Sequence, residues 1–388
     1  MSTYLNISDK IKLNSGPNPL LLNFYEGAAA AYSLRKLDAL YNGDAITVRR
    51  ASDNNTQNIG FVNNELDTAS LESFVNSGQT FDNPDITSAT GWTIGAKTTY
   101  NASTEAFDLV NENGLTVRQG KSVAGHTYAI TIVLNNVTSG GVKVYAGGTQ
   151  SAVYSTNGTH TFNITAGSSN DILGINPNGL VNLSISSFYA VDITGDGFVT
   201  TWYDQSGNGN NAAQSNASSQ PKIVSLGSTI TENTKPTIKF DGVDDFLLNN
   251  DTISASSNYW VFYARNLTIG SGDYVFDTEI GRMVFERTYQ SAYYDGGFIG
   301  TPISSGNHLI HLELVSPSSG SVYEDGVNTQ SGLSYTQNAI SSTNAIGGRY
   351  SGGLNANINM QEFIIYNTDQ SSNRTAIETN INSYYSIY

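Results

Sequence analysis

Residues Ser321-Val322-Tyr323-Glu324-Asp325-Gly326-Val327 join a short strand to an Asp-Gly turn. This pairing is a strong local signal for a β-hairpin, because Asp and Gly tolerate the positive φ angles of the turn. Similar short strands flank the hairpin on both sides, so the chain beyond residue 195 is predicted to be all-β. We expect strands at 198–203, 237–240, 246–248, 259–264, 274–276, 283–287, 308–315 and 361–366.

A different block precedes this region, between about residues 79 and 194. It contains alternating strands at 127–134, 142–145, 160–164 and 181–191. Gly- and Asn-rich turns such as Asn157-Gly158 separate the strands. Evenly spaced strands with such turns are typical of a β-sandwich or jelly roll, and the block is long enough to be a domain.

Three segments show a helical pattern. Residues 27–41 place Ala30, Leu34, Leu37 and Tyr41 at helical spacing. Asp67 is a predicted N-cap for a short second helix. The last helix is expected over 371–385. Residues 1–23 contain the breaker cluster Gly16-Pro17-Asn18-Pro19 and are predicted to form an N-terminal arm or anchor.

The composition narrows the function classes. The chain has 388 residues, a formal net charge of −15 and no cysteine. The missing cysteines exclude disulfides, thiolate metal sites and a Cys nucleophile. Because no Lys/Arg cluster is visible, we expect no nucleic-acid partner. We also expect no membrane insertion and no secretory signal, since neither a long apolar run nor a basic start followed by one is present.

Two sets of motifs carry family resemblances. The first comprises Phe240-Asp241-Gly242-Val243-Asp244-Asp245, the hairpin at 322–327, Ile346-Gly347-Gly348 and the stretch 360–366. In this order they resemble the concanavalin A-like and laminin G-like superfamily. That resemblance implies two packed antiparallel sheets.

The second set comprises 31–35, 48–53, 66–69 and Trp202-Tyr203-Asp204-Gln205-Ser206-Gly207-Asn208-Gly209-Asn210. It is similar to the catalytic domain of the arabinofuranosidase B family and to phage structural proteins with the same arrangement. In such relatives the segment 66–74 leads almost directly to the strand before Tyr203. We therefore expect a discontinuous concanavalin A-like sandwich, 24–78 plus 195–388. A second sandwich, resembling carbohydrate-binding jelly rolls, is expected as an insert at 79–194.

The arabinofuranosidase resemblance also implies a pair of catalytic carboxyl groups. The expected nucleophile position corresponds to Glu279 in Phe276-Asp277-Thr278-Glu279. The acid/base should follow Ile346-Gly347-Gly348, where this chain has Arg349. A guanidinium cannot donate its proton near neutral pH, so we expect no glycosidase activity.

Other polar clusters have structural interpretations. Asp204, Gln205, Ser206, Gly207, Asn208 and Gly209 are expected to form a tight structural loop. Asp241, Asp244 and Asp245 offer oxygen ligands for a structural calcium ion, although carboxylates in a loop more often cap turns. No other cofactor is expected. His308 and His311 lie three apart in a predicted strand and so face opposite ways, which argues against a shared metal.

Aromatic side chains are candidates for glycan binding, because Tyr and Trp combine an apolar face with a polar edge. Trp202 and Trp260 lie in apolar strands and are expected in the core. The candidates are Trp92, Tyr100, Tyr145 and Tyr154 in the insert and Tyr289, Tyr293 and Tyr294 beyond it.

Together these features favour a non-catalytic protein of a bacteriophage virion surface, such as a capsid decoration, head fibre or tail-associated protein. The arm would contact other virion proteins, and a homo-oligomer, possibly a trimer, is expected. Weak adhesion to cell-surface glycans would be strengthened by many copies. Two alternatives stay open: an arabinofuranosidase-like hydrolase and a free carbohydrate-binding protein.

Overall fold

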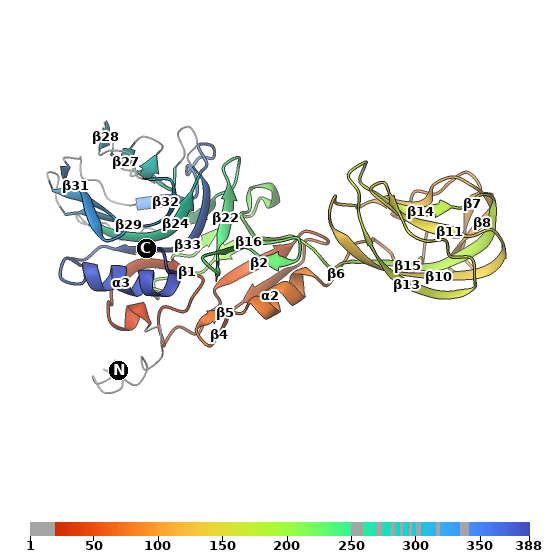
Figure 1. The fold of residues 1–388 in the computed structure, drawn as a ribbon, viewed down its shortest axis with the longest axis horizontal. Coiled ribbons are helices and arrows are strands. Elements are labelled where there is room, and N and C mark those ends of the chain that lie inside the picture. The colour runs from red at the N-terminus through yellow and green to blue at the C-terminus, as the bar shows by residue number, and fades with distance from the viewer. Residues whose placement is uncertain are drawn as a thin grey trace.

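The computed structural model describes residues 20–249, 259–268, 274–280, 284–287, 290–294, 297–299, 304–315, 319–333 and 341–388. For strand residues between 279 and 299, and for 341–342, only the backbone is described. Figure 1 shows two bodies of β-sheet, which we call the main body (20–77 and 193–388) and the inserted block (78–192). The strand ladders in the described residues are antiparallel, which confirms the predicted all-β fold.

The main body is organised around β33 (Asn357–Tyr366). One edge of β33 pairs with β24 (Tyr259–Leu267), and the other pairs first with β22 (Ile238–Asp241) and then with β1 (Ala28–Ser33). β33 has neighbours on both edges, and its side chains from Met360 to Tyr366 are all buried, polar and apolar alike.

The ladder extends from β33 in both directions and wraps around one core. β16 pairs with β2, β17 and β18, which links two runs of strands. The first run also contains β29 (Gly306–Leu314), β30 (Gly320–Glu324), β31 (Val327–Leu333), β18 (Lys222–Ser225), β16 (Gly197–Trp202), β2 (Ile46–Arg50) and β3 (Thr56–Ile59). The second contains β17 (Ala212–Ala213), β23 (Leu247–Asn249), β32 (Ser341–Ile346), β25 (Phe276–Ile280), β26 (Val284–Arg287), β27 (Gln290–Tyr294) and β28 (Gly297–Ile299).

Trp202 and Trp260 are buried in the main body, as the sequence predicted.

Short elements complete the main body. The remaining short elements are β4 (Phe61–Val62), β5 (Glu65–Leu66), β19 (Ser228–Thr229), β20 (Thr231–Glu232), β21 (Lys235–Pro236), and the 3₁₀ turns η1 (Leu21–Asn23) and η2 (Ala217–Ser219).

The helix predicted over 27–41 is wrong. Residues Ala28–Ser33 form strand β1, and all six are buried. Ala29 and Tyr32 pack in the main core, whereas Ala28 and Ala31 pack in a second cluster under the C-terminal helix. Small residues are needed here because the strand is covered on both faces, and this tertiary requirement overrides the helix propensity of alanine.

The other two helices confirm the prediction. α2 (Thr68–Val75) begins at Asp67, whose side chain accepts a hydrogen bond from the Ser70 backbone N–H. α3 (Arg374–Tyr385) covers one side of the sheet near the chain end (Figure 1). No helix in the described ranges is long and apolar enough to span a bilayer.

Part of the predicted N-terminal arm belongs to the main body. Leu21 and Leu22 are buried in the cluster under α3, because their apolar side chains pack there instead of facing water. The rest of the predicted arm, residues 1–19, lies outside the described residues.

The inserted block is a pair of antiparallel sheets around its own core. The strands predicted at 127–134, 142–145, 160–164 and 181–191 are all present. One sheet has the order β13 (Gly158–Thr165), β10 (Thr127–Ser139), β15 (Val181–Asp192), β8 (Ala106–Glu112), β7 (Thr98–Asn101), with β6 (Gly78–Gln79) also on β15. The other has the order β12 (Thr149–Gln150), β11 (Val142–Ala146), β14 (Ile172–Pro177), β9 (Thr116–Gly120).

The chain enters and leaves the inserted block through adjacent segments. Gly78 pairs with Asp192 where β6 meets the end of β15 (Figure 1). Next to this pair, the Asn76 side chain accepts a hydrogen bond from the Gly195 N–H. On the main-body side β2 pairs directly with β16. The strands before and after the insertion therefore belong to one sheet, whatever lies between them.

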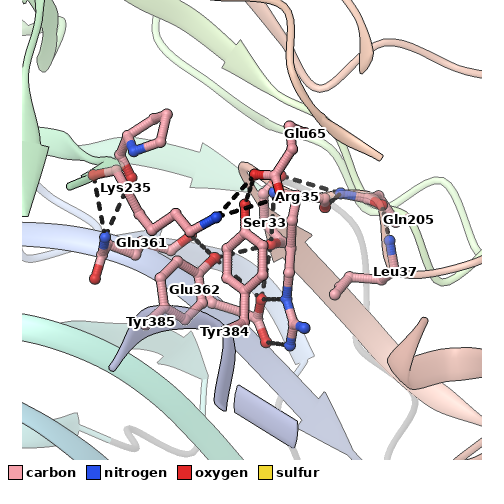
Figure 2. Close-up of polar contacts among 11 residues, drawn as sticks. Ser33, Arg35, Leu37, Glu65, Gln205, Lys235, Gln361, Glu362, Tyr384 and Tyr385 are labelled. Carbon is pink, nitrogen blue, oxygen red and sulfur yellow. Dashed lines mark hydrogen bonds and ion pairs between the residues drawn. The ribbon is translucent and has the colours of Figure 1, made fainter. Parts of the chain in front are cut away.

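A buried ion pair joins the two ends of the main-body chain (Figure 2). Arg35 Nε lies 2.8 Å from Glu362 Oε2, and Arg35 Nη2 lies 3.0 Å from Oε1. The two side chains are 3% and 0% exposed. The guanidinium also lies 4.7 Å from the ring centroid of Tyr384 in α3. This bidentate contact holds β33, the segment after β1 and the helix in one arrangement.

Glu362→Gln is expected to destabilise the main body by about 3–5 kcal/mol, because Arg35 would stay buried without a counter-charge. The measurement is denaturant unfolding followed by the fluorescence of Trp202 and Trp260 in a Trp92→Phe background. Lys121→Gln removes one partner of an exposed pair with Asp82 and is expected to cost less than about 1 kcal/mol. Equal small losses in both variants would contradict the role given to the buried pair.

Candidate functional site

The predicted structural loop follows β16 and lies against β1. Asp204 accepts hydrogen bonds at Oδ1 from the Ala31 and Ser206 N–H groups, at 2.8 and 2.9 Å. Its other oxygen accepts from the Asn210 N–H at 3.0 Å and from the Ser206 hydroxyl. Because Asp204 is buried and its oxygens accept from four donors, it organises the loop backbone.

Gln205 and Asn208 hydrogen-bond to the backbone near β1. The Gln205 side chain donates to the carbonyls of Ser33 and Arg35 and accepts from the Leu37 N–H (Figure 2). The Asn208 amide donates to the carbonyls of Ala28 and Ala29. Gly207 and Gly209 have φ values of +87° and +78°, a conformation that glycine adopts without a steric cost.

A polar cavity lies beside this loop. Its volume is about 430 Å³. It is lined by Gly27, Ala28, Ala29, Ser206, Asn208, Asn210 and Asn367. None of these side chains titrates near neutral pH, so the lining offers no acid or base for catalysis.

The region of the expected glycosidase site is partly described. β25, which contains Glu279, pairs with β32, and the Gly347-Gly348-Arg349 stretch directly follows β32. The side chain of Glu279 lies outside the described residues. Arg349 opens a turn in which the Gly352 N–H donates to its carbonyl. The buried carboxylate of Asp277 accepts from the Tyr350 N–H at 3.4 Å.

The three aspartates predicted as calcium candidates come together. One ligand oxygen from each of Asp241, Asp244 and Asp245 lies within 4.8 Å of the others. Burial, followed by the charges of Asp241 and Asp244, raises the pKa of Asp245 to about 7. Asp245 also accepts a hydrogen bond from the Asp241 N–H. The cluster caps its own turn, and calcium binding stays a prediction.

Trp92 is not an exposed platform. It is only 8% exposed and stacks on Phe188, with ring centroids 5.9 Å apart, inside the core of the inserted block. Its indole N–H donates to the Asn83 carbonyl. The prediction that Trp92 binds a glycan is therefore wrong, because its apolar surface is used to fill the core.

The other candidate tyrosines of the insert are half-buried. Tyr100 packs against Phe107 and donates to the Thr87 carbonyl. Tyr154 stacks on Phe162, with centroids 4.7 Å apart. Tyr145 lies on the outer side of β11 and accepts a hydrogen bond from Asn170. Tyr145 is thus the candidate in the insert whose ring is not part of a described aromatic contact.

The remaining candidates lie wholly or partly outside the described residues. Tyr289 is outside the described residues, and for Tyr293 and Tyr294 only the strand backbone of β27 is described. His308 and His311 face opposite ways as expected: His308 bonds Asp325 near the surface, and His311 stacks on Phe262 in the interior.

No protein-family model matches the chain, and no curated protein sequence matches it. Several solved structures are similar. An arabinofuranosidase complexed with arabinofuranosyl-α-1,2-xylobiose shares 11% identity at a TM-score of 0.49, covering 95% of this chain and 65% of that one. A sialidase of Trypanosoma rangeli with the inhibitor DANA shares 16% identity at 0.34, over 47% of this chain and 32% of that one.

A CBM22 tandem domain from Paenibacillus barcinonensis shares 10% identity at a TM-score of 0.22, covering 72% of this chain and 94% of that one. This chain therefore spans less than two thirds of the arabinofuranosidase, at 65%, and about one third of the sialidase, at 32%. Similarity this low assigns neither a family nor an activity to this chain.

Sequence reasoning missed the polar network around Arg35 and Glu362. The network also includes Tyr384, whose hydroxyl contacts Glu65, and Lys235, whose Nζ lies 3.3 Å from Glu65 (Figure 2). Arg35 and Glu362 are 327 positions apart, so no local pattern could have paired them. The one available signal was a Glu directly before the apolar run Phe363-Ile364-Ile365.

Asp245→Asn is expected to stabilise the protein at pH 8 by about 1–2 kcal/mol, a few degrees in Tm, but not near pH 4. The folded-state pKa of about 7 lies above the unfolded value. Ionising Asp245 therefore costs stability, and this cost grows from about pH 4 and is complete above pH 7. Asparagine removes the cost and can still accept from the Asp241 N–H.

Thermal melts of both proteins at several pH values between 4 and 8 test this expectation. Glu105→Gln, at an exposed carboxylate of the inserted block, is the control for a simple loss of charge. A gain in Tm that is the same at pH 4 and pH 8 would show that Asp245 is not held above its ordinary pKa.

Proposed function

We propose that this chain is a non-catalytic glycan-binding protein, and that it is displayed on the surface of a bacteriophage virion. The observation that carries the non-catalytic part is the sequence from Gly326 to Gln361, which contains neither Asp nor Glu. A retaining glycosidase needs an acid/base carboxyl about 5 Å from its nucleophile. The position that the family resemblance assigns to this acid is Arg349.

The next carboxyl along the chain does not replace it. Glu362 is fully buried, and both of its oxygens accept from the Arg35 guanidinium. Because this side chain is out of contact with solvent and both of its oxygens are occupied by Arg35, it is not available to a substrate as an acid or base. The binding function is supported instead by the inserted block, a two-sheet body joined to the main body through adjacent strands.

The virion part of the proposal is supported by the resemblance of the motifs at 31–35, 48–53 and 202–210 to phage structural proteins. A particle surface would present many copies of each inserted block. Multivalent display converts weak single-site contacts into firm adhesion, so each copy needs only modest affinity.

The protein is expected to release no arabinose from an aryl α-L-arabinofuranoside, even at high protein concentration and long incubation. Wild type and Glu279→Gln should give the same background rate, because the second carboxyl is missing. An active arabinofuranosidase serves as the positive control. Turnover that Glu279→Gln abolishes would favour the hydrolase alternative and remove the non-catalytic assignment.

The full chain, multimerised on beads, is expected to bind a subset of glycans on an array. Mass spectrometry of purified phage particles, from a phage whose genome encodes this chain, is expected to detect the chain. Glycan binding without any particle association would instead favour a free carbohydrate-binding protein. Absence of both would refute the proposal.

A further inference from the structure

One row of side chains crosses the outer face of the smaller sheet in the inserted block. Tyr145 pairs with Gln150 on one side and with Gly174 on the other, and Gly174 pairs with Arg118. Thr93 extends the row through a bridge to Arg118. Directly paired residues of adjacent strands point to the same face, so this row presents an amide, a phenol, a guanidinium and a hydroxyl together.

The opposite face of these strands is apolar and buried. Val144, Leu173 and Ile175 alternate with the row and pack in the core of the inserted block. The alternation fixes the direction of the row, because reversing it would expose the core. Tyr145 and Arg118 are both half-buried and therefore remain accessible on the outer face.

Tyr145 is held in place from one end. Its hydroxyl accepts a hydrogen bond from Asn170 Nδ2 at 2.7 Å. Asn170 is itself fixed, because its Oδ1 accepts from the Ile172 N–H. A phenol ring that is already oriented loses little entropy when a sugar stacks on it.

Gly174 brings the neighbouring strands close together. A Cβ at this position would lie 2.4 Å from Arg118 Cβ, and it would also meet the Val117 carbonyl at 3.2 Å. Any side chain here would displace Arg118. The glycine therefore allows Arg118 to lie over the strand that separates it from Tyr145.

The charge on this face is not neutralised within the described residues. Neither the Arg118 guanidinium nor the Lys143 ammonium makes an ion pair or hydrogen bond there, and Lys143 lies two residues from Tyr145 on the same face. The Asp171 carboxylate lies by Gly120, at the end of β9. By contrast, a carboxylate lies within 4 Å of Arg35, Arg50, Lys121, Lys222, Lys235 and Arg374.

We propose that this face binds a pyranose that carries a carboxylate, such as a uronic or sialic acid. The sugar ring would stack on Tyr145, and its carboxylate would accept two hydrogen bonds from Arg118, with Lys143 adding a second positive charge. Gln150 and Thr93 are placed to bond hydroxyl groups at the two ends of the row. This inference rests on the proposed glycan-binding function and specifies its ligand and its face.

The test uses the full chain and two acidic probes, trigalacturonate and sialyllactose, each with a neutral counterpart, galactotriose and lactose. Binding is measured by titration calorimetry or ligand-observed NMR at low and physiological salt. We expect at least one acidic probe to bind more tightly than its neutral counterpart. Arg118→Gln should weaken that probe about tenfold or more and reduce its salt dependence, while leaving the neutral sugar unchanged.

Two further variants separate the contributions. Tyr145→Ala should weaken acidic and neutral probes alike, because stacking does not depend on charge. Lys97→Gln removes a positive charge beside β7 in the other sheet and is the matched control, with no expected effect. Unchanged thermal melts in each variant would show that the fold is intact.

Failure of this inference can be told apart from failure of the proposed function. If neither acidic probe binds, or if Arg118→Gln behaves like Lys97→Gln, this face is not the site. Glycan-array binding that survives Arg118→Gln and Tyr145→Ala together would overturn this inference and keep the general function. A wild-type chain that binds no glycan at all would overturn both.

Discussion

Arg35 and Glu362 form the contact on which the main body depends. Two charges that are almost fully removed from water are stable only when each is paired, so the fold must bring β33 and the segment after β1 together. The ring of Tyr384 and the hydroxyl of Tyr385 complete the surroundings of the pair, which also fixes α3. The ion pair therefore holds the segment after β1 next to β33 and α3, near the two ends of the main-body chain.

The loop at Asp204 supplies hydrogen-bond partners to the backbone groups on the second edge of β1. One edge of this strand pairs with β33, but along the other edge no strand of comparable length lies among the described residues. Side chains replace that strand: Asp204 accepts from Ala31, and Gln205 donates to the carbonyls that follow. Buried backbone groups need partners, so this loop requires Asp, Gln and Asn for a structural reason. A dense polar motif of this kind resembles a catalytic site in the sequence, although its oxygens accept from the backbone.

Local signals predicted much of the fold. β10 and β15 alternate clearly, the Asp67 cap begins α2, and Asp325-Gly326 turns the hairpin between β30 and β31. Each depends on neighbours in sequence. The helix prediction over residues 27–41 failed because distant elements determine the burial of β1. The prediction that Trp92 is an exposed platform failed for a related reason. The sequence shows that its ring is amphipathic, but it does not show that Phe188 covers the ring. The row from Gln150 to Arg118 combines four segments, so only the strand register could reveal it.

The charge balance of the chain restricts how the inserted block can select an acidic sugar. With 33 acidic and 18 basic residues, the long-range field repels anions. At physiological salt this repulsion fades over about 8 Å, whereas a contact between Arg118 and a carboxylate is short and directional. Selection must therefore occur on contact, and association is not accelerated by steering. Slow, weak capture at single sites is compatible with adhesion only when many copies act together, which is the condition that a repeated particle surface supplies.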